Sequence, residues 1–183
     1  MSSSVLWFYG LSGSGKTTVT DRVYAILKEQ HRQVIILDAD VLRFNYWPEV
    51  GLSKDARLEN TRRITRLAKT YYDIGVTVLI AACAPFQQQR EEALAILPNI
   101  KFIYMDTPLS VCQERKPTLY RADNVNKITS VDPLPLPWAV INCDQDIDTV
   151  INHLNSLRYD TNTKNMGAPH APTHPARLLP CGL

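Results

Sequence analysis

The sequence VLWFYGLSGSGKTT, residues 5–18, determines how the rest of the chain is interpreted. Residues 5–9 are largely apolar and predict a short buried strand, and residues 10–17 fit the pattern G-x-x-x-x-G-K-[ST] without a mismatch. The three glycines of this loop let the backbone curl so that successive N–H groups point at phosphate oxygens. The helix predicted from Thr18 directs the positive end of its dipole toward the same anion. The stretch therefore indicates a loop that binds the phosphates of a nucleoside triphosphate.

Two side chains of the loop carry chemistry. Lys16 supplies a positive charge to the β- and γ-phosphates, and the Thr17 hydroxyl can ligate Mg²⁺. A chance loop of glycine and serine is the alternative, but the predicted strand before it and helix after it supply the context that the motif requires. The residues of this stretch expected to bind the nucleotide are Gly10, Ser12, Gly13, Ser14, Gly15, Lys16, Thr17 and Thr18.

Length and composition are those of one soluble domain. The 183 residues are 45% hydrophobic and 21% charged, and the net charge of +2 is too small to suggest a nucleic-acid or membrane partner. The four cysteines contain no C-x-x-C pair, which favours reduced thiols over a disulfide framework or a zinc site. No signal peptide fits before the first strand, and no apolar run is long enough to span a membrane. We therefore expect a cytoplasmic protein.

Two carboxylates follow the second predicted strand. Residues 34–37 form a continuous apolar run, typical of a parallel strand buried on both faces, and Asp38 and Asp40 come directly after it. Ligands bind outside the carboxyl ends of strands in open parallel sheets, so both carboxylates are expected near Lys16. One can hold Mg²⁺ or its waters, and the other can accept a proton from an acceptor hydroxyl. The alternative is that Asp38 and Asp40 merely cap the next helix, because Asp is a favoured cap residue.

The remaining pattern predicts an α/β fold with a mostly parallel five-stranded sheet and helices on both faces. The apolar runs alternate with segments of helical periodicity, as expected for strands joined by helical crossovers. The expected strands are 5–9, 34–37, 76–82, 101–106 and 138–142. The expected helices are 18–30, 55–72, 87–97, 108–115 and 146–157, with a loop over 44–52.

The helix over 55–72 is rich in arginine. Arg57, Asn60 and a row formed by Arg62, Arg63 and Arg66 share it. Arginine clusters suit bidentate recognition of phosphate. For the row taken alone, a solvated charged face is the alternative.

Two later segments differ from the rest. The polar segment 116–137 is long for a connection between a helix and a strand, and such segments are usually functional. We predict a lid that closes over the nucleotide, excludes water and aligns the phosphoryl donor.

From residue 158 the chain is rich in Pro, Asn and Thr without periodicity. The expected organisation is one domain over 1–159, with the lid at about 116–137, and a disordered tail over 160–183.

The order of motifs resembles that of the adenylylsulfate kinase family, which phosphorylates the ribose 3′-hydroxyl of adenylyl sulfate with ATP and Mg²⁺. The first motif is shared by many nucleotide-binding families, whereas the ordered set is much more specific. The resemblance implies a three-layer P-loop nucleoside triphosphate hydrolase/kinase fold. It covers about residues 5–157 and is carried by GLSGSGKTT (10–18), LDADVLR (37–43), GLSKDARLENTRR (51–63), APFQQQRE (84–91) and DTPLSVCQERKPTLY (106–120).

The resemblance implies roles for single residues. It gives Asp38 a metal- or water-ordering role and makes Asp40 the base beside the acceptor hydroxyl. Arg115 matches the arginine that begins the lid, near the base of ATP. The residues implied in binding the acceptor nucleotide, its phosphosulfate and its sugar are Asp40, Arg43, Arg57, Asn60, Ala84 and Leu119. The family is often dimeric, so a homodimer is also expected.

The acceptor motifs depart from the family pattern. Two phenylalanines that sandwich the acceptor's adenine in the family correspond here to Leu52 and Ile128, and stacking on an aromatic ring contributes roughly 1–3 kcal/mol per base. A family serine is replaced by Ala84. The lid motif is one residue shorter and lacks its acceptor-binding lysine unless Lys116 takes that place. The donor half of the predicted site is kept, and the acceptor half is changed.

Three hypotheses follow. The first is a kinase of adenylyl sulfate in sulfate activation. The second keeps the chemistry with another nucleotide acceptor, such as the cytidine diphosphoramidate of capsule modification, because a smaller pyrimidine needs less aromatic surface. The third is a nucleotide-binding regulator without catalysis, against which the retention of Lys16, Thr17, Asp38 and Asp40 argues.

Overall fold

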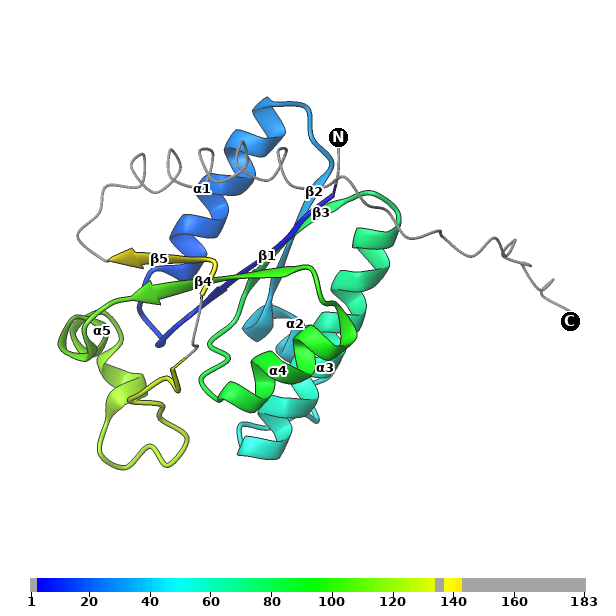
Figure 1. The fold of residues 1–183 in the computed structure, drawn as a ribbon. Coiled ribbons are helices and arrows are strands. Elements are labelled where there is room, and N and C mark those ends of the chain that lie inside the picture. Colours follow the sequence, from blue (N-terminus) through cyan, green and yellow to red (C-terminus); the bar gives the residue numbers. More distant parts are fainter. Residues whose placement is uncertain (1–2, 134–136, 143–183) are drawn as a thin grey trace, which may run out of the picture.

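The computed structural model describes residues 3–133 and 137–142 of the chain. Within them, five strands form one sheet in the order β2-β3-β1-β4-β5, and every neighbouring pair is parallel (Figure 1). The predicted parallel sheet is therefore confirmed. The helix expected over 146–157 and the tail over 160–183 lie outside the described residues. The strands are β1 (Val5–Tyr9), β2 (Val34–Asp38), β3 (Thr77–Ala81), β4 (Ile100–Asp106) and β5 (Ala139–Asn142).

Helices cover both faces of the sheet, because strands buried on both sides present apolar residues in both directions. On one face Leu6 and Phe8 of β1 belong to the same core cluster as α1, and on the other face Trp7 belongs to the cluster that includes α3 and α4. Figure 1 shows these helices on opposite sides of β1. The helices are α1 (Lys16–Glu29), α2 (Ala39–Tyr46), α3 (Lys54–Asp73), α4 (Gln87–Ile96), α5 (Leu109–Arg115) and the short 3₁₀ helix η1 (Pro117–Tyr120).

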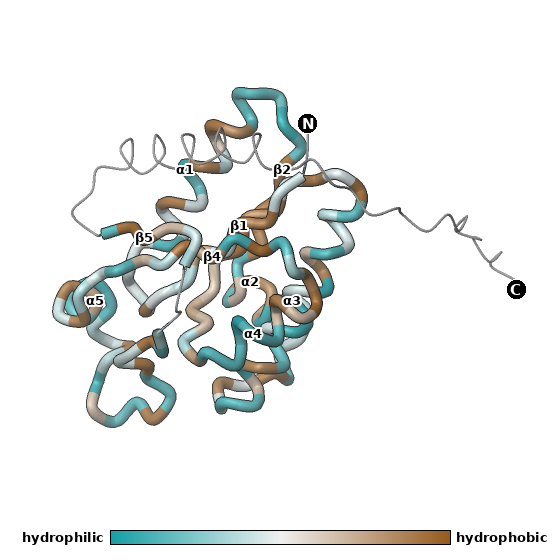
Figure 2. Tube along the Cα trace, viewed as in Figure 1, coloured by the Kyte–Doolittle hydropathy of each residue, from teal (hydrophilic) through white to brown (hydrophobic). Residues whose placement is uncertain are grey.

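The central strand explains why the first motif organises the chain. All five residues of β1 are buried, and the strand pairs with β3 on one side and β4 on the other. Figure 2 shows hydrophobic residues concentrated along β1 and β2. The loop that leaves β1 at Gly10 therefore starts in the middle of the sheet, at the carboxyl edge where parallel strands bind ligands.

One boundary differs clearly from the prediction. The loop expected over 44–52 begins only after Tyr46, because α2 extends from Ala39 to Tyr46. The Asp38 side chain starts this helix by accepting bonds from the N–H groups of Asp40 and Val41, at 2.9 and 3.1 Å. Such a cap satisfies N–H groups that a helix cannot pair internally. The helix cap that the sequence offered as an alternative for Asp38 is therefore present, and it starts a helix that the expected elements did not include.

The segment predicted as a lid is hydrogen-bonded near both ends to loops at the carboxyl edge of the sheet. At its start, the Tyr120 hydroxyl donates to the Ser12 carbonyl at 2.7 Å. At its return, the Asp132 N–H donates to the Pro85 carbonyl at 2.7 Å. Residues 134–136 lie outside the described part, and the lid role itself stays a prediction. None of the helices in residues 3–133 and 137–142 is long and apolar enough to cross a membrane.

Candidate active site

A cavity of about 620 Å³ opens at the carboxyl edge of the sheet, and we call it the donor cavity. It is lined by the loop after β1, the first turn of α1, the ends of β2 and β3, and the start of the lid. Of the predicted nucleotide-binding residues, all except Gly10 line it. The six predicted acceptor residues line it as well, so the structure brings residues from five separate motifs to one place. Those six are Asp40, Arg43, Arg57, Asn60, Ala84 and Leu119.

The glycines of the loop are required by its geometry. Gly10, Gly13 and Gly15 have φ values of 147°, 88° and 93°, which other residues rarely adopt. A Cβ on Gly10 would lie 2.8 Å from the Met105 carbonyl oxygen, and one on Gly13 would lie 3.0 Å from that of Cys112. The loop can therefore curl tightly against β4 and α5 only with glycine at these two positions.

The loop fits a triphosphate. No side chain caps α1, so the N–H groups of its first turn are left for an anion. The Lys16 ammonium donates to the carbonyls of Gly10 and Leu11, at 3.1 and 2.7 Å, and so lies over the loop. The Ser14 hydroxyl lines the cavity and is buried without a hydrogen-bond partner among the described residues. These are the features of a site that is completed by phosphate oxygens.

Oxygen ligands for Mg²⁺ lie at the same edge. Thr17 and Asp38 both line the donor cavity, and hydroxyl and carboxylate oxygens are the donors that Mg²⁺ prefers. Asp38 caps α2 through Oδ1, while no described residue bonds its Oδ2. Capping therefore does not use up this carboxylate, and the two predicted roles of Asp38 are compatible. The pair fits an ion that takes its remaining ligands from phosphates and water.

Asp40 and Arg43 form an ion pair one turn apart on α2, with Oδ1 and Nη2 at 2.5 Å. The Asp40 side chain is 78% exposed and that of Arg43 only 21%. Both residues line the donor cavity and also a smaller neighbouring hollow. A carboxylate in this position is accessible to substrate from both sides.

The smaller hollow, of about 140 Å³, lies between α2, the start of α3 and the lid, and we call it the acceptor pocket. It shares Ser12, Asp40, Arg43, Arg57, Cys83 and Leu119 with the donor cavity. Leu52 and Ile128, which stand where the resemblance places two phenylalanines, both line it. The two departures are thus neighbours in space although 76 positions apart in the sequence.

Arg57 and Asn60 are positioned by α3. The Arg57 guanidinium donates to the carbonyls of Leu52 and Asn126, at 2.9 and 3.0 Å, so it connects α3 to the lid. Burial lowers the pKa of Arg57 below its usual value, but an arginine stays charged at neutral pH. The Asn60 side chain accepts from the indole N–H of Trp47 at 2.6 Å, which fixes its orientation at the cavity wall.

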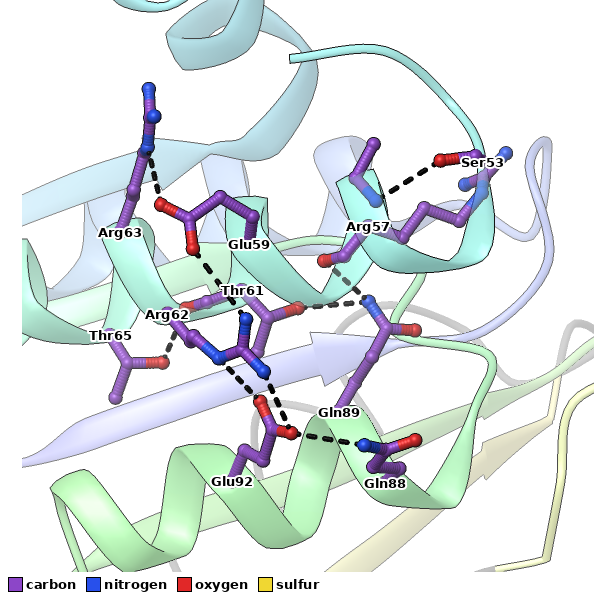
Figure 3. A network of polar contacts seen from close by, with 11 residues as sticks. Ser53, Arg57, Glu59, Thr61, Arg62, Arg63, Thr65, Gln88, Gln89 and Glu92 are labelled. Carbon is purple, nitrogen blue, oxygen red and sulfur yellow. Dashed lines mark hydrogen bonds and ion pairs between the residues drawn. The ribbon is translucent and has the colours of Figure 1, made fainter.

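The arginine row on α3 does not belong to either cavity. Arg62 pairs with Glu92 of α4 at 2.8 Å, and Arg63 pairs with Glu59 at 2.9 Å (Figure 3). Arg63 also pairs with Glu49 at 2.5 Å. Arg66 is exposed and lines neither cavity. Arg62 and Arg63 are ion-paired and Arg66 is exposed, so the structure favours the alternative of a solvated charged face for this row.

The loop after β3 is held by Arg90 of α4, a residue to which the sequence assigned no role. Ala84 has φ 39°, a left-handed conformation that is unusual for alanine, and its carbonyl accepts from Arg90 at 2.7 Å. Arg90 is fully buried and also donates to the carbonyls of Asp132 and Pro133, at 2.6 and 3.2 Å. It therefore holds the cavity wall and the end of the lid together.

Five further residues that line the cavities were not predicted from the sequence. Cys83, Gln89, Asn124, Asn126 and Lys127 line one or both cavities. Gln89 bridges to α3 through the Arg57 carbonyl and the Thr61 hydroxyl, at 3.0 and 2.8 Å (Figure 3). Gln89 lies within the motif APFQQQRE (84–91), but the other four belong to none of the motifs that carry the resemblance. The only available signal was proximity in sequence to Ala84 and Ile128.

Three residues at the start of the lid, Arg115, Lys116 and Leu119, lie at the donor cavity. Arg115 donates to the Gly13 carbonyl at 3.2 Å, and Leu119 lines both cavities. Lys116 lines the donor cavity and not the acceptor pocket. The Lys116 side chain lies against the phosphate-binding loop, since a Cβ on Gly13 would lie 3.3 Å from its Cγ.

Comparisons with known proteins agree with the motifs. A sequence profile of the family described as adenylylsulphate kinase matches residues 2–135. The adenylyl-sulfate kinase of Lactiplantibacillus plantarum is 39% identical over 151 residues, which are 80% of this chain and 73% of that protein. That of Marinobacter nauticus is 35% identical over 161 residues, which are 84% and 81% of the two chains.

A solved structure extends the agreement to three dimensions. The Mycobacterium tuberculosis APS kinase CysC, in complex with AMPPNP and APS, superposes with a TM-score of 0.79 at 29% sequence identity. The match covers 86% of this chain and 98% of the other. Both the predicted resemblance and the predicted fold are thus confirmed. The chain belongs to the adenylylsulfate kinase family, and it is an ATP-dependent kinase.

Proposed function

We propose that this kinase transfers the γ-phosphoryl group of ATP to the 3′-hydroxyl of adenylyl sulfate. The observation that carries the proposal is the position of Asp40, which lines both the donor cavity and the acceptor pocket. A base for phosphoryl transfer must reach the acceptor hydroxyl while that hydroxyl faces the donor phosphate.

The residues of the chain have distinct tasks in this reaction. Asp40 accepts the proton of the 3′-hydroxyl while the bond from that oxygen to the γ-phosphorus forms and the bond to the β-phosphate oxygen breaks. Lys16 stabilises the negative charge that spreads over the phosphates, since catalysis of this transfer is mostly positioning and electrostatics. Arg57 binds the acceptor's acidic group from α3. Thr17 and Asp38 would hold Mg²⁺, which would neutralise further phosphate charge when bound.

A second acceptor class is supported by the walls of the acceptor pocket. Leu52 and Ile128 offer aliphatic rather than aromatic surface, which favours adenine less than a stacked pair of rings would. An acceptor nucleotide with a smaller base, such as a cytidine derivative, is therefore the second candidate.

An acceptor panel tests both candidates. ADP release is measured with ATP and Mg²⁺ and either adenylyl sulfate or cytidine and uridine diphosphate derivatives. We expect saturable turnover with adenylyl sulfate. If ATP binds but only a pyrimidine nucleotide is phosphorylated, the first candidate is wrong and the second is right. Light scattering of the purified chain tests the expected homodimer.

A further inference from the structure

The acceptor pocket contains more positive than negative charge. Its lining includes three cationic side chains, those of Arg43, Arg57 and Lys127, and one carboxylate, that of Asp40. Arg43 and Asp40 neutralise each other in their 2.5 Å ion pair. Arg57 and Lys127 are therefore the two charges of the pocket that need an explanation.

Both remaining cations bind only neutral partners within the described residues. Arg57 donates to the carbonyls of Leu52 and Asn126. The Lys127 ammonium donates to the carbonyls of Ala122 and Arg121, at 3.2 and 3.4 Å. An ammonium has three donors, so these two long bonds leave one free. No carboxylate of residues 3–133 or 137–142 pairs with either cation.

The two cations of the pocket come from different elements, α3 and the lid. Arg57 extends from α3 and binds the lid at Asn126, the residue immediately before Lys127. Lys127 belongs to the lid and precedes Ile128, which also lines the pocket. The other lysine of the lid lies elsewhere, because Lys116 lines the donor cavity and a Cβ on Gly13 would lie 3.3 Å from its Cγ. The lid thus supplies one lysine to each half of the site.

We propose that Lys127 is a specificity-determining residue that binds the acidic group of the acceptor together with Arg57. A bound anion offers both cations an opposite charge, and it lets the Lys127 ammonium replace its two long bonds to carbonyls by a shorter bond to a charged oxygen. The pocket then selects acceptors that carry negative charge. The aliphatic side chains of Leu52 and Ile128 cannot make this selection. This inference rests on the proposed function for the identity of the acceptor, but the charge recognition itself can be tested separately.

A purely structural role for Lys127 makes a different prediction. Its two carbonyl contacts lie within the lid turn, so the side chain could serve only to close residues 121–127. In that case loss of the charge disturbs the lid as a whole and affects both substrates alike. Recognition of the acceptor instead changes the KM of the acceptor alone.

Steady-state kinetics separate these two roles. We expect Lys127→Gln to raise the KM for adenylyl sulfate by about ten- to a hundredfold, as for loss of one hydrogen bond to a charged group, with the KM for ATP changed less than about twofold. Lys127→Arg should recover most of the loss. The matched control is Lys69→Gln, which removes a lysine paired with Asp73 at the far end of α3 and should change neither constant. Equal changes in both KM values, or none, would overturn the proposal.

A second measurement does not depend on turnover. With the donor cavity saturated by AMPPNP, inorganic phosphate should protect Lys127 from reductive methylation, detected by mass spectrometry, and leave Lys69 reactive. Protection without turnover of adenylyl sulfate would remove the proposed function and keep the anion site. Turnover of adenylyl sulfate with unchanged kinetics in Lys127→Gln would keep the proposed function and remove the anion site. A kinetic defect without protection would show a structural role and overturn the proposal.

Discussion

The donor cavity and the acceptor pocket meet at Asp40, but they are built in opposite ways. The phosphate-binding part of the donor cavity comes from one continuous stretch, residues 12–19. The acceptor pocket gathers single residues from α2, the start of α3, the end of β3 and the lid. A contiguous loop keeps its geometry through its own backbone, whereas a pocket of scattered side chains depends on every element that supplies one.

The difference explains where this chain departs from its family. A triphosphate is the same ligand in every kinase, so the loop must keep its glycines and its lysine. Acceptor contacts are side chains on separate elements, and each can change without disturbing the fold. Of the three positions where the resemblance implies another residue, Leu52 and Ile128 line the acceptor pocket and Ala84 lines the donor cavity.

The strongest test of the comparison is a substitution where the two halves meet. We expect Asp40→Asn to lower kcat by about 10²–10⁴-fold, the usual contribution of general base catalysis, with little change in the KM for ATP. The control is Asp21→Asn, an exposed carboxylate on α1 outside both cavities. Full turnover in Asp40→Asn would show that the base lies elsewhere and that the halves do not meet at this residue.

A substitution confined to the donor half should affect every acceptor equally. Lys16→Ala removes the charge that faces the phosphates, and we expect kcat/KM for ATP to fall by about 10²–10³-fold, as for loss of one preorganised donor. The same factor should be found with any acceptor that is phosphorylated. A factor that varies with the acceptor would mean that the two halves are not independent.

A substitution confined to the acceptor half should improve one substrate. Leu52→Phe and Ile128→Phe restore an aromatic surface on each wall of the acceptor pocket. A stacked base contributes about 1–3 kcal/mol. The KM for adenylyl sulfate should therefore fall by about five- to a hundredfold for each substitution. The KM for ATP serves as the internal control. An unchanged KM for adenylyl sulfate would indicate that its adenine does not bind between these residues.

The smallest effect is expected outside both halves. Hydrogen bonds from Arg63 hold the pKa values of Glu49 and Glu59 below the usual 4.5. Because folding lowers these pKa values, the stabilisation is complete above about pH 4.5 and is lost as the pH falls through the lowered values. Arg63→Gln should therefore decrease the urea midpoint slightly at neutral pH, and this decrease should shrink as the pH falls through the lowered pKa values. Arg66→Gln is the control, and an equal decrease in both variants would contradict the assignment.

Much of the fold followed from local patterns. The buried runs predicted each strand within one or two residues, because parallel strands covered on both faces read as continuous apolar stretches. The second helix was missed, since its cap residue Asp38 also ends a strand and its exposed face carries Val41 and Phe44. Exposed apolar residues weaken the amphipathic pattern by which helices are recognised.

The candidate site shows the same division. The sequence by itself determined the phosphate-binding loop, the carboxylate pair and the family, because these depend on spacing along one segment. Only the tertiary structure decided that Arg62 and Arg63 pair with glutamates while Arg57 faces the acceptor pocket, although all three lie on one helix. It also decided that Lys127, not Lys116, lines that pocket. Which charges face a ligand depends on the neighbours that packing supplies, and those neighbours are distant in sequence.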